Sequence, residues 1–154
     1  MLKHQQTRHR MQGVTLIEVL VAATILAVGL LGMAALLGSA MQSNQHASAR
    51  TQAVMLGGDM LDRMRANDAN AENYVSSQGS RACDLDWSYD DDLSVAANDL
   101  DEWYSHIACY LPAGQGQIQV VGDRVTVSVS WTDIDSENED GLQDQETITL
   151  ISDL

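Results

Sequence analysis

The chain has 154 residues, which suffices for one small domain beside a membrane segment. Its formal net charge is −14, and the charge is divided unevenly: residues 66–154 hold 19 acidic residues against two arginines, whereas residues 1–13 hold three basic residues and no acidic one. This balance argues against nucleic-acid binding, because contacts to phosphate require Lys and Arg.

A long apolar segment follows the basic start of the chain. After Gly13-Val14-Thr15-Leu16-Ile17-Glu18 come 23 uncharged residues, Val19 to Met41, which are enough for a helix to span a bilayer. A carboxylate inside such a helix costs a few kcal/mol, so Glu18 calls for a functional explanation and a partner. Basic residues before the segment and acidic ones after it predict a cytoplasmic N-terminus and an exported body.

The junction from Gly13 to Glu18 resembles the processing signal of type IV pilins, in which a prepilin peptidase cuts after the Gly and methylates the new terminal amine. The resemblance implies cleavage between Gly13 and Val14, methylation of Val14, and Glu18 as the fifth residue of the mature chain. This chain departs from the family at Val14, where the family most often has Phe.

The position of Glu18 is consistent with a role in setting assembly register. When many such helices pack side by side, the terminal amine of one subunit can pair with the Glu18 carboxylate of a neighbour, and pairing is strongly favoured at low dielectric. Two alternatives stay open. Glu18 could lie at the headgroup level of a simple signal anchor, or the segment could be a cleaved signal peptide ending at Gly38-Ser39-Ala40.

The helix is predicted to continue through residues 42–67, which contain no proline. Apolar residues recur there at spacings of three and four, namely Ala49, Ala53, Leu56, Met60 and Met64. Asp59 and Arg63 form a favourable i,i+4 pair. Gly57-Gly58 predicts a local bend or close packing. Gly29, Gly32 and Gly38 could serve either close helix approach or local loosening.

The run Asp59-Met60-Leu61-Asp62-Arg63-Met64-Arg65-Ala66-Asn67 carries a second resemblance. Together with Arg50-x-Gln52-Ala53 before it and the stretch Asp99 to Gly116 after it, it is similar to the minor pilins of the type IV pilus modification protein PilV family. The resemblance covers most of the chain, and ordinary major pilins lack this run.

The remaining residues predict a small α+β head. Residues 68–92 form a polar connector, and a helical period runs from Leu93 to Pro112, with Asp99 and Glu102 at capping-box spacing and the acids 90–92 near its N-terminus. Three antiparallel strands are then predicted: one around Ile118 and Val120, one around residues 125–131 after a Gly122-Asp123 turn, and one over residues 146–151.

Three groups of side chains could carry further chemistry. Cys83 and Cys109 can pair in an oxidising compartment, the alternative being two free thiols. The oxygen ligands Asp133, Asp135, Glu137 and Asp144 weakly suggest calcium, but an EF-hand loop would need Gly and Glu where Asn138 and Asp144 stand, so a solvated acidic hairpin is the alternative. The four histidines have no nucleophile at motif spacing, so we expect no enzyme and no other cofactor.

We therefore expect a pilin-like α+β protein with a basic leader (1–13), an apolar membrane and assembly half of the long helix (14–41), an amphipathic half (42–67) and a periplasmic head (68–154). The resemblance implies a minor pilin that helps initiate type IV pilus assembly and supports motility and adhesion. Its partners would be other minor pilins, the major pilin, the prepilin peptidase, the assembly platform and the inner membrane. The alternatives are a minor pseudopilin of a type II secretion system and a bitopic anchor displaying a calcium- or ligand-binding module.

Overall fold

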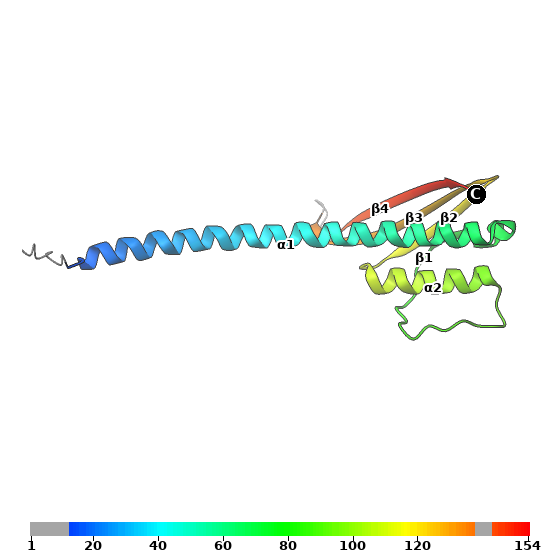
Figure 1. Cartoon of the computed structure of the whole chain (residues 1–154), viewed down its shortest axis with the longest axis horizontal. Coiled ribbons are helices and arrows are strands. Elements are labelled where there is room, and N and C mark those ends of the chain that lie inside the picture. The colour runs from blue at the N-terminus through cyan, green and yellow to red at the C-terminus, as the bar shows by residue number, and fades with distance from the viewer. Residues whose placement is uncertain (1–12, 138–142) are drawn as a thin grey trace, which may run out of the picture. The chain divides into compact units, whose positions relative to one another are not determined.

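The computed structural model describes residues 13–137 and 143–154, with side chains for 13–133 and 144–154. The elements in chain order are α1 (Leu16–Ala66), the 3-10 helix η1 (Asp68–Tyr74), β1 (Ser76–Gly79), α2 (Val95–Tyr110), β2 (Gln115–Val121), β3 (Arg124–Glu137) and β4 (Gln143–Asp153) (Figure 1). The chain divides between Met41 and Gln42 into two units, which are described separately below.

Helix α1 is 51 residues long and confirms the predicted continuous helix. Glu18 in its first turn and Arg63 and Arg65 in its last turn complement the helix dipole. Up to Met41 its large apolar side chains are exposed. In the second unit a stripe at helical spacing is buried instead, made of Ala53, Leu56, Met60, Leu61 and Met64.

The second unit contains an antiparallel sheet in the order β1-β2-β3-β4. The hairpin between β2 and β3 turns at Gly122-Asp123 as predicted, with Gly122 at φ +60°. Alternate residues of β2 and β3 are buried, and the buried residues lie opposite one another, as Ile118 and Val127 do. Val127 in turn lies opposite Leu150 of β4. This alternation gives the sheet one apolar and one polar face.

The connector and the number of strands differ from the prediction. Residues 68–92 contain η1 and the short strand β1, so the described sheet has four strands rather than three. The sequence of β1, Ser-Ser-Gln-Gly, has no apolar alternation and its pairing with β2 is irregular, running from Ser76 opposite Ile118 to Gly79 opposite Gly116. A strand of this kind is formed by its neighbour more than by its own sequence.

The start of α2 also corrects an expectation. Ser94 is the N-cap, and its side chain accepts a hydrogen bond of 3.2 Å from the Ala97 backbone N–H. Asp99 and Glu102 therefore lie inside the helix and do not form a capping box. The first turn of α2 holds no acidic residue, so the acids 90–92 precede the helix and are outside its first turn.

Helices α1 and α2 pack on the apolar face of the sheet through glycines. A Cβ at Gly116 of β2 would come within 2.5 Å of Trp103 Cη2, and a Cβ at Gly57 of α1 would lie 2.7 Å from Leu150 Cδ1. Gly57 therefore serves close packing, one of the two predicted roles, whereas Gly58 meets nothing within 4 Å. The buried Trp103 indole N–H donates to the Leu56 carbonyl at 2.9 Å and ties α2 to α1.

Candidate functional site at the N-terminal segment

The Gly13–Val14 bond precedes α1 and is exposed. Gly13, Val14 and Thr15 have no helical structure, Val14 is 68% exposed, and a Cβ at Gly13 would meet no atom within 4 Å. Helix α1 begins immediately afterwards, where the Thr15 carbonyl accepts from the backbone N–H groups of Glu18 (3.1 Å) and Val19 (3.3 Å). The bond between Gly13 and Val14 therefore lies outside the helix, before its first turn.

Glu18 lies on the first turn of α1, whose large apolar side chains are exposed up to Met41. Its backbone N–H also lies 3.4 Å from the Thr15 hydroxyl, which is in N-cap position. Among the described residues, α1 is the helix that is long and apolar enough to cross a membrane, and its most apolar window has no buried residue within the chain. Thr24, a polar residue within this half, donates its hydroxyl to the Leu20 carbonyl at 2.5 Å and so meets its hydrogen-bonding need inside the helix.

In the second unit, Arg63 near the end of α1 is the centre of a charged network. Its guanidinium contacts Asp59 at 2.9 Å on the same helix, as predicted, and also Asp99 at 3.1 Å and Glu102 at 2.5 Å on α2. Tyr74 of η1 donates its hydroxyl to Asp99 at 2.6 Å. Arg63 thus joins α1 to α2 directly, and Asp99 joins both to η1.

The network shifts two pKa values. Burial on its own would lower the pKa of Arg63, but the hydrogen bond to Glu102 and the charges of Asp59 and Glu102 outweigh it and raise that pKa above its ordinary value. Burial and the hydrogen bond to Asp99 raise the pKa of Tyr74 to about 12. Arg63 is therefore a permanent cation and Tyr74 a permanent donor at neutral pH.

The two cysteines are joined. Cys83 and Cys109 form a disulfide with their Cα atoms 4.7 Å apart, which links the segment before α2 to the last turn of α2. Of the two alternatives left open by the sequence, the structure has the paired one.

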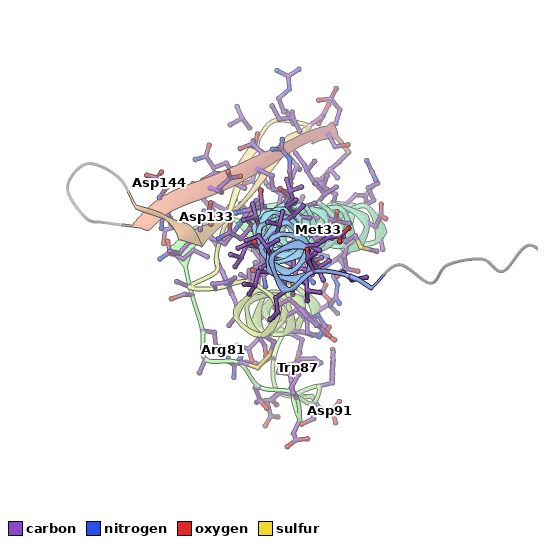
Figure 2. All side chains as sticks on the ribbon, turned by 90° about the vertical axis from the view of Figure 1, so that its left-hand side faces the viewer. Met33, Arg81, Trp87, Asp91, Asp133 and Asp144 are labelled. Carbon is purple, nitrogen blue, oxygen red and sulfur yellow. A yellow bond between two sulfur atoms is a disulfide. The ribbon has the colours of Figure 1, made fainter. Side chains whose placement is uncertain are left out.

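The weak calcium candidates are only partly described. Asp133 lies 3.2 Å from His46 Nδ1 of α1, and Asp144 is exposed on β4 (Figure 2). The side chains of Asp135 and Glu137, and residue Asn138, lie outside the described part. Within residues 13–133 and 144–154 no three His, Cys, Asp or Glu side chains gather as a metal site would require.

Sequence reasoning missed several residues that bring segments together. It identified Asp99 and Glu102 as a capping box, whereas both bind Arg63. It gave His46 no partner, whereas His46 pairs with Asp133. The available signal was the i,i+3 spacing of Asp99 and Glu102, which places both carboxylates on one side of a helix. Only the fold shows that this side faces Arg63 of α1.

Comparison with known proteins matches one family model, the prokaryotic N-terminal methylation motif, at residues 8–34. No curated protein and no solved structure matches the chain. The motif is that of structural subunits and not of enzymes, and it implies contact with the prepilin peptidase and the pilus machinery in general. With the long apolar helix it fits anchoring in the inner membrane before assembly. The motif, α1 and the four-stranded α+β unit together support a type IV pilin-like or pseudopilin-like protein.

Proposed function

We propose that this chain is a minor pilin of the PilV kind, which is cut between Gly13 and Val14, methylated at Val14 and assembled into a type IV pilus. The single observation that carries the proposal is the methylation motif over residues 8–34, placed on an exposed Gly13–Val14 bond directly before a helix with bare apolar sides. The second unit would then face the periplasm, consistent with its excess of acidic residues after the apolar span.

The mechanism is structural. Cleavage would create a terminal amine at Val14, four residues before Glu18, and the carboxylate of one subunit could pair with the amine of the next. Because an unpaired carboxylate among apolar helices is costly, this pairing selects one stagger between neighbours. The exposed apolar side chains up to Met41 would then supply the lateral contacts with other minor pilins and with the major pilin.

A minor pseudopilin of a type II secretion system is the second candidate, because the same motif would serve it. The run from Asp59 to Asn67 favours the pilus interpretation through its resemblance to PilV proteins. Within the structure this run has a local role, since Arg63 binds Asp99 and Glu102, and Asn67 donates to the Tyr74 hydroxyl at 3.1 Å.

The test is an intact-mass measurement on the chain extracted from its membrane, with and without the prepilin peptidase. We expect a product that starts at Val14 and carries one added methyl group, and that is lost when the peptidase is absent. A chain that keeps residues 1–13 in both hosts would identify a simple anchor and contradict the proposal.

The register mechanism has its own test. Glu18→Ala should leave cleavage intact but abolish pilus assembly, whereas the matched change Glu72→Ala, at an exposed carboxylate of η1, should leave assembly unchanged.

A separate experiment distinguishes the minor pilin from the minor pseudopilin: the gene is deleted, and both piliation and protein secretion are scored. Loss of secretion with normal piliation would favour the pseudopilin.

A further inference from the structure

The segment before α2 places apolar and acidic side chains in solvent. Leu85 is 79% exposed and Tyr89 is 55% exposed, and Asp86 is exposed between them. From Asp84 to Leu93 none of the side chains is buried, so this segment adds nothing to the core. Exposed large apolar groups that cluster on one segment commonly mark an interaction surface.

The same segment is held firmly by buried polar side chains of α2. Ser105, which is fully buried, accepts a hydrogen bond from the Asp84 backbone N–H at 2.9 Å and donates one to the Asp84 carbonyl at 2.8 Å. Asn98, which is 2% exposed, binds the Asp90 backbone in the same two-sided way, at 2.8 and 2.9 Å. We name residues Asp84–Asp90 the anchored loop.

Three further interactions hold the anchored loop and the residues directly before it. The Cys83–Cys109 disulfide lies directly before it. Asp101 of α2 forms an ion pair with Arg81 and accepts a hydrogen bond from the Trp87 indole N–H at 3.2 Å. Figure 2 shows Arg81, Trp87 and Asp91 on the side of α2 that faces away from the sheet. Burying a polar side chain costs free energy unless the side chain is hydrogen-bonded. Because Asn98 and Ser105 are buried and bind a loop that lies outside the core, we infer that the conformation of this loop serves a function.

The anchored loop borders a hollow of 520 Å³ whose walls are mostly acidic. Trp87, Tyr89 and Leu93 supply its apolar wall, and six aspartates surround them, namely Asp84, Asp86, Asp90, Asp91, Asp92 and Asp101. Of these, Asp101 is paired with Arg81. The surface thus combines a backbone that is hydrogen-bonded to α2, aromatic groups and an excess of negative charge.

We propose that the anchored loop and this hollow form a docking surface for a protein partner that presents lysine or arginine side chains on a partly apolar segment. Complementary charge would steer the partner, and Trp87 and Tyr89 can receive its cations on their ring faces. Holding the loop in one shape before binding reduces the ordering cost of association. A second copy of this chain is disfavoured because residues 66–154 carry 19 acidic residues and two arginines. This docking surface goes beyond the assembly role and does not require cleavage at Gly13.

The first test measures binding of a fluorescent oligolysine peptide to the full oxidised chain in nonionic detergent, with an oligoglutamate peptide as the opposite probe. Asp86→Asn with Asp91→Asn should weaken oligolysine binding by about tenfold or more, and Tyr89→Ser should weaken it further. The matched control removes two exposed acids of β4, Asp144→Asn with Glu146→Gln. Equal weakening by the control pair, or equal binding of oligoglutamate, would show a general charge effect and overturn the proposal.

The second test places a photo-crosslinking residue at Leu85 in cells, with Val121 as control because it is 77% exposed on β2. We expect a discrete adduct from position 85 alone, mapped to a segment of another protein rich in lysine or arginine, and lost with the Asp86 and Asp91 changes. No adduct, an adduct with a second copy of this chain, or one with an acidic segment would overturn the proposal. Cleavage at Gly13 is scored in the same cells, so failure here is distinguishable from failure of the proposed function.

Discussion

Arg63 is the residue whose charge the second unit depends on most. It is 22% exposed and contacts three carboxylates, two of which belong to α2. A guanidinium can bind several carboxylates at once because its donors form a rigid planar fork. Without it, Asp59, Asp99 and Glu102 would face one another with no cation between them.

We therefore expect Arg63→Met to lower the free energy of unfolding by about 2 kcal/mol, less than for a fully buried pair because water still reaches the network. The measurement is urea unfolding of the full chain in detergent, followed by the fluorescence of its three tryptophans, all of which lie beyond Met41.

Arg65→Met is the matched control for this prediction. Arg65 pairs with Asp62 at 2.6 Å on the exposed side of the same helix turn and donates to the Ser152 hydroxyl at 2.7 Å. Exposed pairs of this kind contribute less than about 1 kcal/mol. If the Arg65 and Arg63 changes had equal effects, the network around Arg63 would have no special role.

Tyr74 makes stability depend on alkaline pH. Its pKa is raised to about 12 in the folded chain from the ordinary value of 10.0, so the folded state favours the neutral phenol. The resulting stabilisation is complete below pH 10 and is lost as the pH rises through 12. Titration of tyrosinate absorbance should show one late-ionising tyrosine, and Tyr74→Phe should remove it and cost about 1 kcal/mol at neutral pH. A late phase that survives in Tyr74→Phe would contradict the assignment.

At the level of elements, two glycines with different surroundings give opposite predictions. Gly116→Ala places a methyl group against the ring of Trp103, which cannot swing away while its indole is bound to the Leu56 carbonyl. We expect it to destabilise the second unit by about 1–3 kcal/mol. Gly58→Ala meets nothing within 4 Å and should stabilise by up to about 1 kcal/mol through helix propensity. Urea unfolding of both variants tests this pair, and a stabilising Gly116→Ala would show that the ring can relocate.

The elements also show what sequence can predict. The half of α1 up to Met41 was predictable because its apolar run is long enough to span a membrane. The other half of α1 and residues 125–131 of β3 were predictable because their apolar residues repeat at the period of the element. Strand β1 was not, because Ser-Ser-Gln-Gly has no such period and pairs only where β2 is already present. The capping box of Asp99 and Glu102 was wrong because acidic residues at capping-box spacing occur inside a helix as readily as at its end when they have a partner such as Arg63.

At the scale of the whole molecule, the N-terminal segment and the anchored loop differ in whether the residues that form them are adjacent in sequence. The segment from Gly13 to Glu18 is contiguous in sequence, so a linear motif is enough to identify it. The anchored loop depends on Asn98 and Ser105, which bind it from positions 8 and 21 residues further along the chain. Neither residue has a pattern that marks it as an anchor, so that surface could be found only from the fold.

The Cys83–Cys109 disulfide affects the stability of the second unit as a whole, because it closes a loop that contains the anchored loop and almost all of α2. Cys83 and Cys109 are 26 residues apart, and closing a loop of that length restricts the unfolded chain by about 3 kcal/mol. Replacing both with Ser should lower the free energy of unfolding by about that amount while the sheet stays intact, because its core residues lie outside the closed loop. Hydrogen exchange would show it: amides of β2 and β3 should keep their ranking as the best protected, and those of Asp84 and Asp90 should exchange faster. Unchanged stability in the double variant would mean that the unfolded chain is already restricted there without the bond.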